Sequence, residues 1–284
     1  MSTPALISER DYRRLSGLIR SEWGIDFPPA KRIMIETRLG KRARALGMPS
    51  IADYCDYLHS PEGKLQEGPH LIDAVTTHKT DFFREPSHFD YLVQRVAPDL
   101  AKQCGAGIRR PLAVWSSACS TGEEPYTIAM VLSDYARSLE PQKYRFNIEA
   151  TDISPLVLKT GQEGIYPEEA IGPVPDRLRR EYLLRSKDRH RAKVRIVPEL
   201  RSRVCFRELN LLASDYGFPE PLDVVLCRNV MIYFDRRAQQ QVLSRIIQTL
   251  REDGYLMMGH AESLSGLDLP LVQVTPTVYR RRDG

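Results

Sequence analysis

The sequence predicts two folded units, an N-terminal all-helical domain followed by an α/β domain with a mainly parallel sheet. The chain has 284 residues, which is enough for two hydrophobic cores at about 150 residues per domain. Its hydrophobic fraction of 42% and charged fraction of 27% are typical of a globular protein. The apolar pattern is helical at first and, after Phe82, alternates between short β-rich runs and helical stretches, as in α/β folds.

Four helices are predicted in the N-terminal part, at Asp11 to Trp23, Lys31 to Leu46, Ile51 to Leu58 and Pro69 to Thr77. The second helix ends at Gly47 and has apolar residues at spacings of three and four: Ile33, Ile35, Leu39, Ala43 and Leu46. Its basic residues lie mostly on other faces, and they are Arg32, Arg38, Lys41, Arg42 and Arg44. We therefore expect an amphipathic helix with a basic outer face.

In the α/β part, strands are predicted at Leu112 to Ser117, Arg145 to Thr151, Val204 to Glu208, Leu222 to Cys227, Tyr255 to Gly259 and Leu271 to Arg280. Helices are predicted at Pro125 to Leu139, Pro155 to Glu163 and Arg236 to Leu250, the last with Asp235 as N-cap. Between Tyr166 and Cys205 this alternation stops. That stretch contains Pro167, Pro173 and Pro175, a charged helix near Pro175 to Leu184 and β-like runs at Val194 to Val197 and Arg203 to Phe206, so we expect a small insertion there.

Composition narrows the class of protein. The five cysteines form no CxxC pair and the six histidines show no metal-ligand spacing, so we expect no metal site and no disulfide framework. No apolar run reaches about 18 residues and the start, MSTPALISER, has no signal-peptide core, so we expect a cytoplasmic protein without membrane insertion. The net charge of only +4 argues against a dedicated nucleic-acid binder, although basic residues concentrate in Lys31 to Arg44 and Arg177 to Arg207.

Polar residues follow four of the predicted strands. The first strand leads into SSACSTGEEPY with Glu123 and Glu124, the second ends at Asp152, the third at Asn210, and the fourth runs into Arg228 and Asn229. The carboxyl ends of parallel strands form the usual binding edge of an α/β sheet. Acids there suit a cationic ligand or a ribose diol better than a phosphate. The residues alone leave open that the two glutamates only complement a helix dipole and that Asp152 only caps the next helix.

Three segments resemble those of bacterial chemotaxis receptor methyltransferases of the CheR type. They are TTHKTDFFRE from Thr76, STGEEPY from Ser120 and CRNVMIYF from Cys227, and the similarity extends over nearly the whole chain. The resemblance implies a helical substrate-recognition domain over residues 1–77 and a Rossmann-like α/β methyltransferase domain over 78–284, with a small antiparallel β-subdomain at 166–205. Family members transfer the methyl group of S-adenosylmethionine to glutamate side chains of chemoreceptors, leaving S-adenosylhomocysteine.

The resemblance also implies roles for individual residues. It implies cofactor contacts for His78, Thr80, Arg84, Glu123, Asp152, Asn210, Leu211, Arg228 and Asn229, and a place near the transfer site for Tyr233. His78 stands where the family usually has asparagine. The basic face of the second helix is implied to bind the helical cytoplasmic domain of a chemoreceptor. Some members also bind a receptor C-terminal tail through the β-subdomain, which makes this a candidate role here, and we expect a monomer.

The chemistry of such a reaction fits the residues. A glutamate side chain has a pKa near about 4.3 and is ionised at pH 7, so it needs no general base.

Two alternatives to a protein-glutamate methyltransferase stay open. A nucleic-acid methyltransferase usually has an Asn/Asp-Pro-Pro-aromatic element at the fourth strand, where this chain has Arg228-Asn229-Val230-Met231. A non-catalytic module that binds S-adenosylmethionine or a receptor is the other alternative.

Overall fold

The computed structural model describes residues 7–25, 32–139, 144–188 and 192–282. The chain forms two compact units, the first comprising Met1–Thr77 with the short segment Tyr233–Ala238, and the second comprising His78–Ile232 and Gln239–Gly284. Among the described residues, no helix combines the length and the apolar character needed to cross a membrane.

The first unit contains four helices: α1 (Glu9–Trp23), α2 (Arg32–Ala45), α3 (Ile51–His59) and α4 (Pro61–Val75). Serine caps start three of them, because the side chains of Ser8, Ser50 and Ser60 each accept a hydrogen bond from the backbone three residues on. The predicted start of the fourth helix at Pro69 is wrong. Pro61 occupies the first turn, where proline is tolerated, and Pro69 lies inside the helix.

The buried face of α2 differs in part from the predicted one. Ile35, Leu39 and Ala43 are buried as expected, but Ile33 is 76% exposed and Leu46 is 39% exposed. Glu36 is buried instead, and its carboxylate accepts hydrogen bonds from the backbone of Ile7 and from Arg32, both at 3.2 Å. A polar residue can take a core-facing position because these partners satisfy its oxygens.

The second unit is an α/β domain, as predicted. The helical elements that follow Thr77 are α5 (Ser87–Tyr91), η2 (Leu92–Val96), α6 (Ala97–Cys104), α7 (Glu123–Ser138), α8 (Pro155–Glu163), η3 (Glu168–Ile171), α9 (Asp176–Tyr182), α10 (Pro198–Arg201), η4 (Met231–Tyr233) and α11 (Arg236–Thr249). Its strands are β1 (Leu112–Ser117), β2 (Phe146–Asp152), β3 (Ile165–Pro167), β4 (Leu183–Arg185), β5 (Lys193–Ile196), β6 (Val204–Glu208), β7 (Leu222–Cys227), β8 (Leu250–Met258), β9 (Leu271–Thr275) and β10 (Val278–Arg281).

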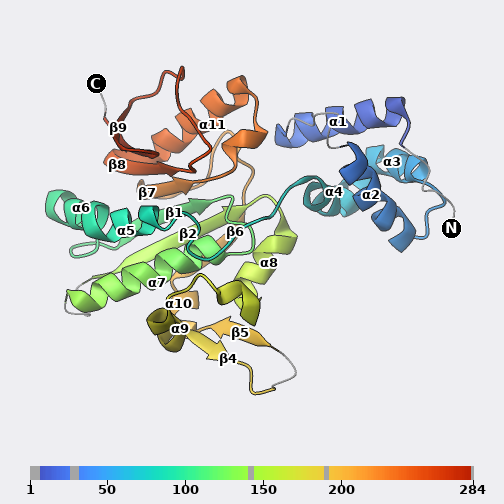
Figure 1. Ribbon diagram of the computed structural model, residues 1–284. Coiled ribbons are helices and arrows are strands. Elements are labelled where there is room, and N and C mark those ends of the chain that lie inside the picture. The colour runs from blue at the N-terminus through green and yellow to red at the C-terminus, as the bar shows by residue number, and fades with distance from the viewer. Residues whose placement is uncertain (1–6, 26–31, 140–143, 189–191, 283–284) are drawn as a thin grey trace. The chain divides into compact units, whose positions relative to one another are not determined.

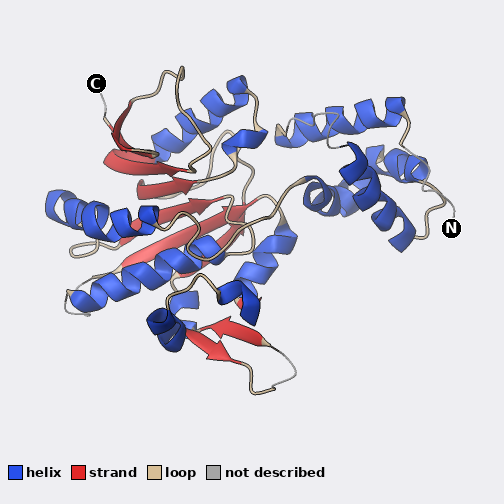
Figure 2. Ribbon diagram, viewed as in Figure 1, coloured by secondary structure: helices blue, strands red, loops and turns tan. Residues whose placement is uncertain are grey.

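The central sheet has seven strands in the order β6-β2-β1-β7-β8-β10-β9. The first five are parallel, and β10 is antiparallel to both of its neighbours. Helices α7 and α8 pack against β2 and β6, and Figure 2 shows helices flanking the strands of this sheet. The strands β1 and β7 are almost entirely buried, which is typical of parallel strands covered on both faces.

The single strand predicted at Leu271 to Arg280 is wrong. A turn at Pro276 and Thr277 divides it into β9 and β10, because proline has no N–H to donate to a ladder and Thr277 has a left-handed φ of 63°. The strand β8 also begins earlier than predicted, at Leu250 rather than Tyr255.

A second, three-stranded antiparallel sheet has the order β3-β5-β4. Figure 1 shows β4 and β5 set apart from the central sheet. The predicted run Arg203 to Phe206 belongs to the central sheet as part of β6, and not to this small sheet. Strands β3 and β4 have only three residues each, too few for a visible sequence pattern.

The order of the strands locates the binding edge. From β1 the chain builds outward through β2 and β6 in one direction and through β7 and β8 in the other. The switch point therefore lies between β1 and β7. In open α/β sheets ligands bind beyond the carboxyl ends of the strands at such a point.

Candidate cofactor site

The loop after β1 has a strained backbone. Ala118 and Ser120 have φ values of 52° and 51°, and Gly122, the N-cap of α7, has a φ of 97°. A Cβ atom on Gly122 would lie 3.0 Å from the Cα of Gly161 and 3.0 Å from the Tyr166 hydroxyl. Residues held in left-handed conformations cluster at functional loops, and this loop starts the binding edge.

Glu123 is the first residue of α7 and its side chain is buried. Its Oε2 accepts a hydrogen bond of 2.6 Å from the Thr121 hydroxyl. Burial raises the pKa of Glu123, and no lysine or arginine side chain of the described residues forms an ion pair with it. The position at a helix N-terminus favours the charged form, but the carboxylate still lacks a cationic partner.

Asp152 ends β2 and is also buried. It accepts hydrogen bonds from the backbone N–H of Ser120, at 2.9 Å, and of Ser154, at 3.0 Å. The side chain of Ser154 itself caps α8 by accepting from Val157, so the alternative that Asp152 is this cap is wrong. Burial raises the pKa of Asp152. Its position at the tip of the second strand suits the hydroxyls of a ribose.

Three further predicted residues, His78, Asn210 and Leu211, are brought to this edge by hydrogen bonds. The Ser120 hydroxyl donates a hydrogen bond of 2.9 Å to the carbonyl of His78. At the end of β6, Leu209 donates its N–H to the carbonyl of Asp152 at 3.0 Å, which places the following Asn210 and Leu211 beside the second strand.

Arg228 and Glu124 form a buried ion pair across the switch point. The guanidinium lies 2.8 Å from Glu124 and 3.1 Å from Glu85, donates to the carbonyl of Arg84, and is only 2% exposed. Glu124 also accepts from the Ser116 hydroxyl at 2.7 Å, and burial raises its pKa despite the neighbouring cation. Arg228 thus joins three segments of the chain. The side chain that the resemblance assigns to the cofactor therefore makes its contacts in this structure with other parts of the protein.

Glu262 was missed by the sequence analysis. Its carboxylate accepts four backbone hydrogen bonds, from Asn229 (2.9 Å), Val230 (2.8 Å), Met231 (2.7 Å) and Gly259 (2.7 Å). These bonds hold Asn229 at a left-handed φ of 59° at the end of β7. No sequence motif pointed to Glu262, because three of its four partners lie more than thirty residues away.

The remaining predicted cofactor residues precede α5. Thr80 and Arg84 are both partly exposed, and Arg84 donates a hydrogen bond of 3.0 Å to the carbonyl of Lys79. Tyr233 ends η4 and belongs to the first unit. Its place near the transfer site stays a prediction.

Three of the five basic residues predicted on α2 are engaged within the first unit. Arg32 pairs with Glu9 and Glu36, Arg38 donates to the carbonyls of Ala74 and Thr76, and Arg42 makes two hydrogen bonds of 2.7 Å with buried Glu67. The side chains of Lys41 and Arg44 are exposed and form no hydrogen bond or ion pair with any described residue. The outer basic face of α2 therefore consists of these two side chains.

A cluster of Glu85, His88 and His260 was also missed. One ligand atom from each residue lies within 4.8 Å of the others, although His260 is remote in sequence. Burial, with the nearby charge of Arg228, lowers the pKa of His88 to about 4, so the ring is neutral at pH 7.

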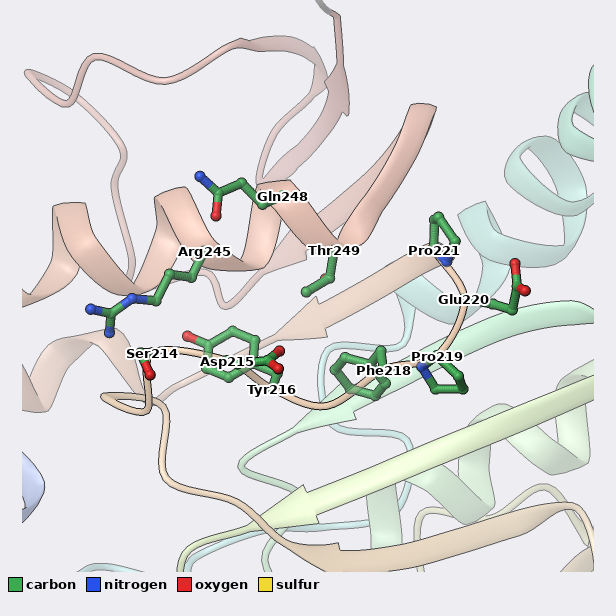
Figure 3. Close-up of a pocket in the computed structure, with 10 residues that line it drawn as sticks. All are labelled: Ser214, Asp215, Tyr216, Phe218, Pro219, Glu220, Pro221, Arg245, Gln248 and Thr249. Atoms are coloured by element: carbon green, nitrogen blue, oxygen red, sulfur yellow. The ribbon is translucent and has the colours of Figure 1, made fainter.

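A cavity of about 350 Å³ lies away from this edge, at the amino end of β7. Figure 3 shows that Arg245, Gln248 and Thr249 come from α11, whereas the other lining residues come from the segment between β6 and β7. None of the predicted site residues lines it.

Comparison with known proteins agrees with this arrangement. Residues 10–76 match the family model for the CheR methyltransferase all-alpha domain, and residues 78–279 match that for the CheR methyltransferase SAM binding domain. The chain is 38% identical to the chemotaxis protein methyltransferase of Escherichia coli, over 98% of this chain and 93% of that protein. It is 34% identical to the chemotaxis protein methyltransferase of Borreliella burgdorferi, over 97% of this chain and 95% of that protein.

These matches cover both units and confirm S-adenosylmethionine as the cofactor. The buried acids at the strand ends fit that molecule, which carries a sulfonium, an ammonium and a ribose diol. The chain belongs to the CheR methyltransferase family.

Proposed function

We propose that the protein transfers the methyl group of S-adenosylmethionine to glutamate side chains of chemoreceptors, forming glutamyl methyl esters for sensory adaptation. The single observation that supports this most is the edge at which Glu123 and Asp152 are buried without a lysine or arginine partner among the described residues. It occurs in a chain whose curated relatives are named chemotaxis protein methyltransferases.

Glu123 and Asp152 would hold the cofactor. Asp152 would accept hydrogen bonds from the ribose hydroxyls, and Glu123 would face a cationic or hydrogen-bond-donating group. His78, Thr80, Arg84, Asn210, Leu211 and Asn229 would line the same edge. Arg228 would position its neighbours, because it contacts Glu124 in the first turn of α7 and the carbonyl of Arg84.

The bound cofactor supplies an electrophilic methyl group whose C–S bond breaks, leaving both electrons on sulfur, as a carboxylate lone pair forms the new O–C bond. No proton moves in this step, so the chain needs no general base. Its residues must align and partly dehydrate the carboxylate, and positioning of this kind contributes about 7 to 11 kcal/mol. We assign Tyr233 to this task, with its hydroxyl donating to the acceptor carboxylate.

The first unit would recognise the receptor. The exposed Lys41 and Arg44 on α2 would attract the acidic helices of a chemoreceptor cytoplasmic domain. The small sheet of β3, β4 and β5 would offer a site for a receptor C-terminal tail. We infer that the protein acts in the cytoplasm as a monomer with residues 1–77 and 78–284 as its domains.

The test is transfer of labelled methyl from S-adenosylmethionine to a receptor signalling fragment. Its glutamate-to-alanine version, duplex DNA and RNA serve as alternative acceptors. Base-labile label on the glutamate fragment alone is expected. Label on nucleic acid would instead indicate a nucleic-acid methyltransferase, and tight cofactor binding without any transfer would indicate a non-catalytic module.

The role of Tyr233 is tested in the same assay. Tyr233→Phe should lower the transfer rate, whereas Tyr57→Phe, which removes a surface hydroxyl on α3, should not.

A further inference from the structure

The side chains of Glu85, His88 and His260 converge in the second unit. The Nδ1 atom of His88 lies 3.6 Å and the Nε2 atom of His260 lies 3.9 Å from Oε2 of Glu85. The two imidazole rings are 5.2 Å apart and inclined at 75°. Two nitrogen donors and one carboxylate thus face a common point. Glu85 comes from the segment before α5, His88 from α5 and His260 from the loop after β8.

The tautomer of His88 is linked to a hydrogen bond with Thr277. Its Nε2 lies 2.7 Å from the hydroxyl oxygen of Thr277, and that hydroxyl donates its proton to the carbonyl of Pro276, also at 2.7 Å. With the hydroxyl proton on the Pro276 carbonyl, Thr277 accepts a hydrogen bond from His88 and the ring proton is on Nε2. The lone pair of the ring is then on Nδ1.

That nitrogen has no partner. His88 is only 2% exposed, and Nδ1 is buried without a hydrogen bond to any described residue. It faces the carboxylate of Glu85, so two electron pairs oppose each other at 3.6 Å. A buried polar atom without a partner is costly, and a cation between the two groups removes both the cost and the repulsion.

We propose that Glu85, His88 and His260 bind a divalent transition-metal ion, with Zn²⁺ as the best match. Two imidazole nitrogens and one carboxylate oxygen form a ligand set suited to such ions. With metal–ligand distances of about 2.0–2.2 Å, ligand atoms of a tetrahedral site lie about 3.4 Å apart. The two measured separations are close to this, and the half-exposed His260 can turn to shorten the third. A solvent molecule would take the fourth position.

The surrounding charge accommodates a dication. Arg228 lies 3.1 Å from Glu85, but it is also paired with Glu124, and Glu262 is bonded to Asn229 beside it. Three carboxylates against one guanidinium leave a formal excess of negative charge that a dication offsets. The Nε2–H of His88 is held by Thr277, which is the outer hydrogen bond that metal-bound histidines usually make.

The ion would fasten the segment before α5 to the loop after β8. Glu85 is held at a left-handed φ of 57°, and its neighbour Arg84 is one of the residues proposed to contact the cofactor. The metal would therefore support one side of the cofactor edge without taking part in methyl transfer. The sequence-based expectation of no metal site rested on spacing, which cannot detect His260, a ligand 172 residues after His88 (260 − 88).

The experiment is titration of the full-length protein with the metal alone. After chelator treatment and gel filtration, ZnCl₂ is added in a calorimeter and CoCl₂ in a spectrophotometer. We expect one ion per chain, with Co²⁺ absorption bands of a nitrogen- and oxygen-ligated site. His260→Ala should weaken binding at least about 100-fold, the upper range for loss of an outer partner. His88→Gln should do the same, because its amide still donates to Thr277 but offers no Nδ1.

The matched control is His70→Ala, which removes a partly exposed histidine of α4 in the other unit and should bind as the wild type does. His260 is half-exposed, so its variant keeps the test valid should the buried His88→Gln variant fold poorly. Absence of binding by the wild type would overturn the proposal, since it would mean that Nδ1 carries a proton or meets water. Equal affinity of His260→Ala and the wild type would overturn it as well.

Discussion

The carboxylate of Glu124 lies 2.8 Å from the guanidinium of Arg228, and this pair joins the first turn of α7 to the loop after β7. Both side chains are nearly inaccessible to water, and Arg228 continues to Glu85 in the segment before α5. The pair therefore holds together three of the segments that form the cofactor edge, at the switch point of the sheet.

Replacing Arg228 by methionine should destabilise the protein by about 3 to 5 kcal/mol. The substitution leaves Glu124 and Glu85 buried without their cation, which costs more than the ion pair itself contributes. Urea denaturation measures the change. The control is Arg20→Met, which breaks an exposed ion pair with Asp235 and should cost less than about 1 kcal/mol. Similar effects at both positions would contradict the structural role of Arg228.

Asp152→Asn should weaken S-adenosylmethionine binding about 10- to 100-fold, because hydrogen bonds to a charged group contribute about 1.5 to 3 kcal/mol. Calorimetric titration with the cofactor measures this. The matched variant is Glu149→Gln on the same strand, whose carboxylate lies 3.6 Å from Arg207 and should not affect affinity. Unchanged affinity of the Asp152 variant would remove this residue from the cofactor site.

The pKa of Asp152 also predicts a pH dependence. Burial raises this pKa in the free protein, and only the ionised carboxylate accepts both ribose hydrogen bonds. Cofactor affinity should therefore fall as pH falls through a value above the usual one of about 4. The stability of the free protein should change in the opposite sense, since a raised carboxyl pKa destabilises the fold at high pH and this cost is relieved on protonation. Both trends should be reduced in Asp152→Asn, and an equal slope in the variant would assign them to other groups.

Gly122→Ala should cost about 1 to 3 kcal/mol. The alanine would have to adopt a φ of 97° and would bring its Cβ within 3.1 Å of Gly161, Tyr166 and Phe206. Thermal unfolding measures the loss. Gly68→Ala in α4 is the control, because nothing lies within 4 Å of its added Cβ and it should raise stability by about 0.5 to 1 kcal/mol. A harmless Gly122→Ala would show that the loop can relax.

The basic residues of α2 should fall into two groups, one that binds the receptor and one that stabilises the fold. The double variant Lys41→Ala/Arg44→Ala should lower kcat/KM for a receptor fragment about threefold to tenfold at low salt, with less effect at high salt. Its stability should stay unchanged. Arg42→Met should instead lower stability by about 2 to 3 kcal/mol, because it leaves the buried carboxylate of Glu67 without its cationic partner. Steady-state kinetics and urea denaturation of each variant test this, and a kinetic defect in Arg42→Met alone would reverse the assignment.

Local sequence patterns predicted the fold and the acidic residues at the ends of the first two strands of the sheet. Alternation of β-rich and helical runs located β1, β2, β6 and β7, of which β1, β2 and β7 are largely buried. Asp152 was identified because an acid directly follows such a run, and its environment in the structure fits the predicted chemistry. Its contact with the cofactor remains a prediction.

The rest depended on contacts between distant residues. Arg42 appears in the sequence as part of a basic face, yet its partner Glu67 lies on another helix, where no periodicity of α2 can reveal it. Glu262 shows no motif because its partners are backbone amides. The division between β9 and β10 depends on the conformation of one residue, Thr277, which is not a usual left-handed residue.

The four amides that donate to Glu262 also make this edge observable by spectroscopy. Protons bonded to a buried carboxylate exchange slowly with solvent and have distinct NMR chemical shifts. The signals of Asn229, Val230, Met231 and Gly259 should therefore change together whenever Glu262 moves. A single ¹⁵N spectrum would then report whether a ligand has reached the carboxyl end of β7, without a label in the site itself.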